Sequence, residues 1–145
     1  MKKLNLKHIF NYIFYMAYIK DEKRWAGSPV LAGILDVSLT VNLYLFIISF
    51  VLVIMGFDLY EEKNILIPVV LAIGTIVAFI NYLIYGYKKK YLKIIEKYKN
   101  EDSETRKKNR LIVTLFIIFS LLVMAVLFVV SVILYRQRHG IVGHF

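Results

Sequence analysis

Residues 111–135 read LIVTLFIIFSLLVMAVLFVVSVILY, a stretch of 25 residues without a charged side chain. A helix needs roughly 20 apolar residues to cross a hydrocarbon core of about 30 Å, so this stretch predicts a membrane-spanning helix. Two further blocks meet the same requirement: residues 65–87 carry no charge, and residues 30–57 carry one, on Asp36. The sequence therefore predicts an all-α integral membrane protein with three transmembrane helices.

The composition agrees with a membrane location and excludes several kinds of chemistry. Of the 145 residues, 59% are apolar or aromatic, and none is cysteine, which excludes disulfides, thiolate metal sites and cysteine nucleophiles. Backbone groups in lipid must find partners within their own segment, so these Val-, Ile- and Phe-rich blocks are expected to be helices rather than strands. Pro68 lies in the first turns of the second block, where a missing N–H costs least, and so marks a helix start.

The basic residues are distributed very unevenly about the three blocks. Of the 19 lysines and arginines, six precede the first block, one lies between the first and second, ten lie between the second and third, and two follow the third. Positively charged loops stay in the cytoplasm, so we expect a protein of the cell inner (cytoplasmic) membrane with a cytoplasmic amino terminus and an extracytoplasmic carboxyl terminus. The same asymmetry accounts for most of the net charge of +9, so membrane lipid is the expected partner and nucleic acid is not.

These observations divide the chain into seven segments along its length. They are a cytoplasmic amphipathic segment (1–28), transmembrane helix 1 (29–57), a short extracytoplasmic loop (58–64), transmembrane helix 2 (65–87), a basic cytoplasmic helical hairpin (88–110), transmembrane helix 3 (111–135) and an extracytoplasmic tail (136–145).

The amino-terminal segment is apolar over residues 9–19, which is too short to cross the bilayer. A cleaved signal peptide is not expected either, because the small residues 26–28 follow the charged cluster 20–24 and Pro29 would come directly after the cut. At 100° per residue the apolar side chains gather on one face, which predicts an amphipathic helix. That helix either lies in the membrane interface or packs on the cytoplasmic ends of the other helices. The residues of this face are Leu6, Ile9, Phe10, Ile13, Met16 and Ala17.

Residues 88–99 keep helical spacing after the second block, so this span is predicted to continue into the cytoplasm as a stalk. Polar turn formers at 100–103, followed by Glu104, predict that the third helix begins near Ser103. The stalk carries an apolar stripe that must be buried by the amino-terminal segment, by another copy or by another protein. The stripe consists of Tyr91, Ile94, Ile95 and Tyr98.

Basic side chains flank both membrane boundaries of this hairpin. Each basic residue near an anionic surface contributes on the order of 1 kcal/mol, so contact with anionic lipid is expected. The residues concerned are Lys88, Lys89, Lys90, Lys93, Arg106, Lys107, Lys108 and Arg110.

Asp36 is the one ionisable residue inside an apolar block and is therefore the default candidate for a function within the membrane. A helix that starts at Pro29 places it about 10 Å along the axis. It is then either an anchoring or ion-paired residue near the interface, or a group that binds a proton, an ion or a partner. Other polar and small residues in the blocks are expected to serve helix packing. They are Ser38, Asn42, Ser49, Gly74, Ala78 and Asn81.

No motif in the chain carries a recognisable chemistry. It contains no glycine-rich phosphate loop, HExxH pair or nucleophile elbow, and no cysteine or carboxylate joins His139 and His144, so no enzyme, metal or cofactor is expected. The leading hypothesis is a small non-catalytic membrane component that acts through self-association or through assembly with a partner membrane protein. The alternatives are an oligomeric pore or small transporter, and an immunity or defence-associated membrane protein.

Overall fold

A computed structural model of the chain describes residues 5–24, 28–57 and 63–140. Every element within these ranges is helical, which confirms the all-α prediction. Most of the expected loop at 58–64 and the end of the expected tail, with His144, lie outside the described residues. In chain order the elements are α1 (Leu6–Arg24), α2 (Pro29–Ile54), α3 (Lys63–Asn81), the π-helical turn η1 (Tyr82–Gly86), the 3₁₀ turn η2 (Tyr87–Lys89), α4 (Tyr91–Lys99) and α5 (Ser103–Arg138).

Three helices are long and apolar enough to cross a membrane, as the sequence predicts. They are Pro29–Ile54, Pro68–Lys89 and Ser103–Arg138. The third begins at the predicted place, because the Asp102 carboxylate accepts the backbone N–H of Thr105 at 2.8 Å and Glu104 lies in the first turn. At 1.5 Å per residue its 36 residues extend about 54 Å, which is well beyond the roughly 30 Å that a helix needs to cross a hydrocarbon core.

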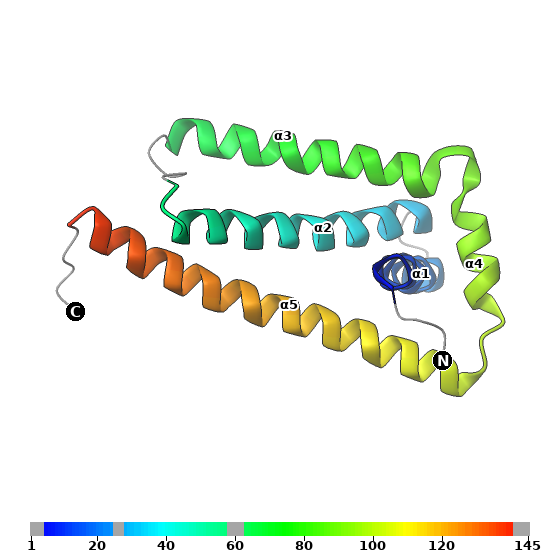
Figure 1. The fold of residues 1–145 in the computed structure, drawn as a ribbon. Helices are drawn as coiled ribbons and strands as arrows, with labels where there is room; N and C mark the ends of the chain where they lie inside the picture. The colour runs from blue at the N-terminus through cyan, green and yellow to red at the C-terminus, as the bar shows by residue number, and fades with distance from the viewer. Residues whose placement is uncertain (1–4, 25–27, 58–62, 141–145) are drawn as a thin grey trace.

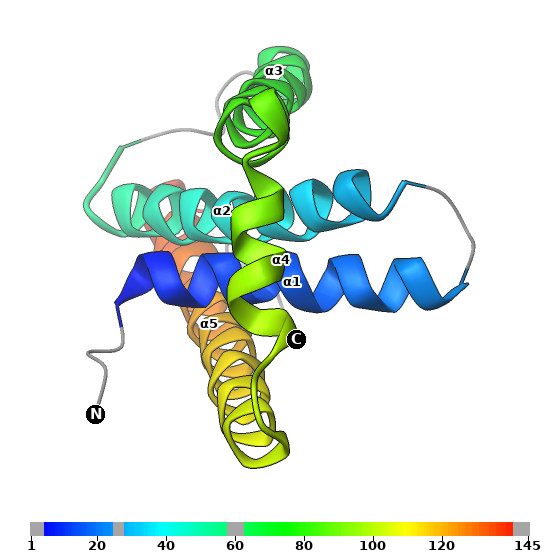
Figure 2. The same ribbon diagram turned by 90° about the vertical axis from the view of Figure 1, so that its right-hand side faces the viewer.

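The three long helices lie in a row, with α2 in the middle (Figures 1 and 2). Helix α2 packs against α3 on one side and against α5 on the other. Among the described residues, α3 and α5 share no extended contact with each other. The arrangement is therefore a single layer of helices rather than a closed three-helix bundle.

Helix α1 lies across one end of this row. It is seen end-on in Figure 1, where the three long helices run across the view, and lengthwise beside α2 in Figure 2. It packs mainly on α2 and also contacts α4 and α5. Packing on the other helices is one of the two placements that the sequence left open for this segment.

The second span does not continue directly into the helix that the sequence predicts after it as a stalk. Lys88 and Lys89 have φ angles of 53° and 54°, so the helix breaks there, and α4 runs across the end of the row in both views (Figures 1 and 2). Left-handed backbone costs a residue other than glycine about 1–2 kcal/mol, and burial of the α4 stripe on α1 offsets this cost. The Lys90 ammonium also donates to the carbonyl oxygen of Leu83 at 3.1 Å, which satisfies an acceptor beside the break.

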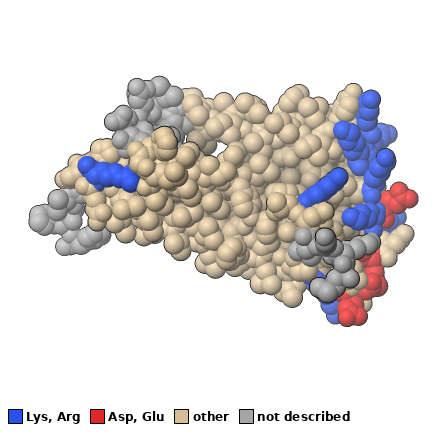
Figure 3. Space-filling view, in the orientation of Figure 1, with Lys and Arg blue, Asp and Glu red and all other residues tan. Residues whose placement is uncertain are grey.

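Charged side chains gather at the end of the molecule where α4 lies, and the middle of the visible face is free of them (Figure 3). Large apolar side chains are exposed along all three long helices; Leu39, Leu71 and Phe119, for example, are 66–67% exposed. An apolar surface of this extent is unusual for a protein in water and is expected for helices that face lipid.

Candidate functional site

The crossing of α1 over the row brings together residues that are far apart in the sequence, and Phe14 is at its centre. The Phe14 side chain is 0% exposed and stacks on the Tyr85 ring, with centroids 4.9 Å apart and planes 7° apart. On its other side lies Gly33, where an added Cβ would come within 2.6 Å of the ring. Helices α1 and α2 therefore approach closely because position 33 has no side chain. The sequence analysis did not predict this contact. The available signal was Gly33, a glycine inside a block of bulky residues, where another helix can approach closely.

A cluster of three tyrosines and one histidine ties α1 to α4 and α5; we call Tyr12, Tyr15, Tyr98 and His8 the tyrosine cluster. The Tyr98 hydroxyl lies 3.0 Å from His8 Nδ1, and the Tyr15 hydroxyl donates to the Tyr98 carbonyl oxygen at 3.1 Å. The Tyr12 hydroxyl donates to the carbonyl oxygen of Arg106 at 3.2 Å. The sequence left the α4 stripe with three possible partners. In the structure Tyr98 of this stripe is buried against the amino-terminal helix, and Tyr91, Ile94 and Ile95 are partly buried against the same core.

The burial of α1 goes beyond the single apolar face expected from the sequence. Four consecutive side chains, from Tyr12 to Tyr15, are all buried. At 100° per residue, four neighbours point in directions that cover most of the helix circumference. The middle of α1 is therefore enclosed by α2, α4 and α5 rather than half exposed.

Burial raises the pKa of Tyr12 and of Tyr98 from 10.0 to about 12, and the nearby Glu101 carboxylate adds to both shifts. A raised tyrosine pKa stabilises the folded state below pH 10, and this contribution is lost as the pH rises through 10 towards 12. We therefore expect α1 to detach between pH 10 and 12. A tyrosinate absorbance titration, with accessibility of Lys20 to trypsin as a second signal, measures this transition.

The control for the alkaline transition is the variant Tyr98→Phe, which cannot ionise at this position. We expect it to lose one late-ionising tyrosine and to keep α1 docked to higher pH. If every tyrosine ionises together near pH 10 in the native protein, the tyrosine cluster is not closed to water and the prediction fails.

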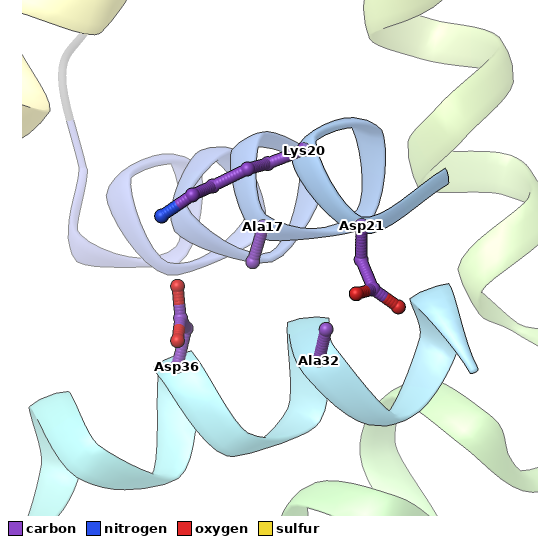
Figure 4. A pocket seen from close by; sticks show the side chains of 5 residues that line it. All are labelled: Ala17, Lys20, Asp21, Ala32 and Asp36. Carbon is purple, nitrogen blue, oxygen red and sulfur yellow. The ribbon is translucent and has the colours of Figure 1, made fainter. Parts of the chain in front are cut away.

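Asp36 lies beside a small hollow of about 180 Å³ between α1 and α2 (Figure 4). The hollow is lined by Asp36 and Ala32 from α2 and by Ala17, Lys20 and Asp21 from α1. The side chain of Lys20 extends from α1 toward Asp36 in this view. Asp36 thus has a basic neighbour at the charged end of the molecule, which favours the anchoring interpretation over an isolated charge deep in the membrane.

Some of the residues expected to serve helix packing contact a neighbouring helix, and others form a hydrogen bond within their own helix. The Asn81 amide donates to Ser38 Oγ at 3.0 Å, which joins α3 to α2 through two buried side chains. A Cβ at Gly74 would lie 4.0 Å from Asn42 Nδ2, so these two also face each other. Ser49 donates to the Leu45 carbonyl oxygen of its own helix, and Ala78 is half-buried.

Two polar contacts between spans were not found by sequence reasoning. The Tyr44 hydroxyl lies 2.7 Å from Ser120 Oγ and joins α2 to α5. At the opposite end of the row from α1, the Arg138 guanidinium donates to the carbonyl oxygens of Val53 at 2.7 Å and Ile54 at 2.6 Å. The sequence places Arg138 in a tail that begins at 136, whereas α5 continues through it. Arg138 can bond these carbonyl oxygens only because the end of α2 lies close to it, and the local sequence does not reveal that proximity.

The predicted lipid-contacting residues occupy two places at the α4 end. Lys88, Lys89, Lys90 and Lys93 surround the turn between η1 and α4, and the ammonium groups of Lys88 and Lys90 lie 5.4 and 5.8 Å from the Tyr87 ring centroid. The other four lie on the first turns of α5, where Arg106, Lys107 and Arg110 line a second hollow beside α1 and Lys108 is exposed outside it.

Comparison with protein-family models, with curated proteins and with solved structures finds no match to this chain. Within the part of the chain that the structure describes, no group of three or more His, Cys, Asp and Glu residues is placed to hold a metal ion. The function must therefore be argued from the geometry of the helices themselves.

Proposed function

We propose that this protein is a non-catalytic component of the inner membrane that acts through self-association, with α1 and α4 on the cytoplasmic side. The observation that carries the proposal is the row of three long helices with α2 at its centre (Figure 2). In a row of three helices the middle helix is exposed on two opposite faces, whereas in a closed bundle every helix buries one face against the others. A second copy that lies against one of these faces would complete a bundle.

Both faces of the row are open along α2. Leu39 and Ile48 are 67% and 54% exposed, and nine residues of separation place them on opposite sides of the helix. The stripe on α4 gives no support to assembly, since its residues are already buried or half-buried in the core that α1 forms with its neighbours. The proposal therefore depends on α2 alone among the spans.

A pore receives less support from the same contacts. A water-filled lumen needs polar side chains along one exposed face of a span. The hydroxyl groups of Ser49, Thr75 and Ser120 each donate to a carbonyl oxygen of their own helix, and Asn42 does the same through its amide. Asn81 and Ser38 are buried against each other. These groups satisfy one another or the backbone rather than forming a lining.

The absence of cysteine makes self-association directly measurable by cysteine crosslinking in native membranes. We expect Leu39→Cys or Ile48→Cys on α2 to give a crosslinked dimer rapidly upon oxidation. Leu71→Cys on α3, which is 66% exposed, is the matched control and is expected to crosslink at least about tenfold more slowly, because random collision in the bilayer is its only route.

Two outcomes contradict this proposal. Equal crosslinking rates at positions 39, 48 and 71 mean that collision alone brings the copies together. Crosslinking from position 39 or 48 to a different protein, with no dimer, means that the open face of α2 serves a partner rather than a second copy.

A further inference from the structure

The second hollow at the α4 end has the construction of a lipid-binding groove. It has a volume of about 370 Å³ and lies where α1 crosses the first turns of α5; we call it the basic groove. Pockets that hold small ligands commonly measure about 300–1,000 Å³, so its size suits a phosphate headgroup with the start of an acyl chain. Its walls belong to a single chain, so the site does not depend on self-association.

One side of the basic groove is cationic. Arg106 and Arg110 are one helical turn apart on α5, Lys107 lies between them, and Lys20 reaches the groove from α1. The Arg106 guanidinium donates through Nη2 to the carbonyl oxygens of Lys99 and Glu101, at 3.3 and 3.2 Å, which holds it at the α4–α5 turn. The three basic side chains of α5, together with Lys20, which also neighbours Asp36, suit an anionic oxygen cluster. Arginine binds phosphate oxygens in a two-pronged geometry.

The other side of the groove is apolar and aromatic. Met16 and Ile19 of α1 line it, together with the rings of Tyr12 and Tyr15, whose positions the tyrosine cluster fixes. Among the residues that the structure describes, no acidic side chain lines the groove. The Glu101 carboxylate, which helps to raise the pKa of Tyr12 and of Tyr15, accepts the Asn109 amide at 2.8 Å through one of its two oxygens. A ligand with both an anionic and an apolar part fits these walls better than free phosphate does.

The groove also lies at the correct depth for a lipid. Arg110 directly precedes the charge-free residues 111–135, and Leu111 and Leu115 are exposed on the outside of α5. The basic groove therefore opens where the polar end of the molecule meets its apolar belt. Basic pockets beside membrane helices on the cytoplasmic side are known binding places for anionic headgroups.

We infer that the basic groove binds one anionic glycerophospholipid, with its phosphate at Lys107, Arg106 and Arg110 and an acyl chain along Met16 and Ile19. This site is distinct from general attraction between a basic surface and an anionic bilayer. It has a fixed stoichiometry of one lipid for each chain, and it requires α1 to be docked.

Native mass spectrometry of the full chain tests this site, with phosphatidylglycerol and phosphatidylcholine of identical acyl chains added in equal amount. We expect one phosphatidylglycerol to be retained for each chain. The double variant Lys107→Gln/Arg110→Gln is expected to weaken its binding about thirtyfold, which corresponds to about 1 kcal/mol for each basic residue. The matched control Lys93→Gln/Lys108→Gln removes the same charge from the same membrane boundary and is expected to change binding less than about threefold.

A third variant and a soluble probe distinguish a lipid from a free phosphate. Ile19→Asn should weaken binding of phosphatidylglycerol, and glycerol phosphate should fail to displace the lipid at equal concentration. The inference is overturned if both double variants weaken binding equally, if phosphatidylcholine is retained as well as phosphatidylglycerol, or if glycerol phosphate competes as strongly as the lipid. None of these measurements is affected if the crosslinking experiment shows no dimer.

Discussion

Replacement of Phe14 by alanine is expected to lower the free energy of unfolding by about 3–5 kcal/mol and to release α1 from the row of helices. The side chain is completely buried between Tyr85 and Gly33, which belong to the second and first spans respectively. Its removal leaves a cavity that neither neighbour can fill, because one is a rigid ring and the other has no side chain. The Phe14–Tyr85 stacking energy, about 0.5–1.5 kcal/mol, is lost as well.

Two measurements check the Phe14 prediction, thermal unfolding in mild detergent and the rate of trypsin cleavage after Lys20. Leu6→Ala is the control, because Leu6 belongs to the same predicted face but is 62% exposed, and substitutions there usually change stability by less than about 0.5 kcal/mol. The complementary variant Gly33→Leu should release α1 from the other side of the contact. If Phe14→Ala and Leu6→Ala behave alike, α1 is not docked and lies in the interface as a separate amphipathic helix.

The three spans could be predicted from the sequence, but the packing of α1 on them could not. The three spans follow from length and hydropathy because bilayer thickness imposes the same requirement on every chain, and residues 111–135 meet it without reference to the rest of the protein. Phe14, by contrast, is important because it contacts Gly33 and Tyr85, which are 19 and 71 residues away in the sequence. The local pattern reveals that α1 has an apolar face but not that α2, α4 and α5 enclose it.

The direction of α4 could not be predicted for a different physical reason. Helical spacing predicts the helix and its apolar stripe, and both are present. The change of direction depends on left-handed backbone at Lys88 and Lys89, and lysine is a residue type that carries no signal for that conformation. Glycine would have been the expected residue at such a break. The energy for this turn comes from burial of Tyr98 on α1, a contact about 80–90 residues away in sequence.

The candidate site was only partly visible in the sequence. The eight basic residues chosen for lipid contact were selected by their nearness to the predicted membrane boundaries. The structure groups three of them with Lys20 and leaves Lys108 outside the groove. Which basic residues share a groove depends on the angle at which α1 crosses α5, and no local pattern encodes that angle.

We predict the second large effect for substitution of Arg138, because this side chain donates hydrogen bonds to carbonyl oxygens at the end of α2. The α2 helix ends in a left-handed glycine, Gly56, with φ of 104°. Backbone N–H groups of Gly56 and Phe57 donate to the carbonyl oxygens of Val53 and Leu52, at 3.0 and 3.1 Å. The Arg138 guanidinium donates to the carbonyl oxygen of Ile54. It also donates to the carbonyl oxygen of Val53, which thereby accepts two hydrogen bonds.

Arg138→Met is expected to destabilise the protein by about 2 kcal/mol, because hydrogen bonds to a charged group contribute about 1.5–3 kcal/mol and this one is partly open to solvent. Arg138→Lys should recover only part of the loss, since an ammonium cannot reach two carbonyl oxygens with the planar fork of a guanidinium. Arg136→Met removes the same charge on a different side of α5 and is expected to cost less than about 0.5 kcal/mol. Unfolding of the three variants in detergent measures these differences. Equal effects at 136 and 138 would mean that the charge, and not the cap on α2, stabilises this end of the row.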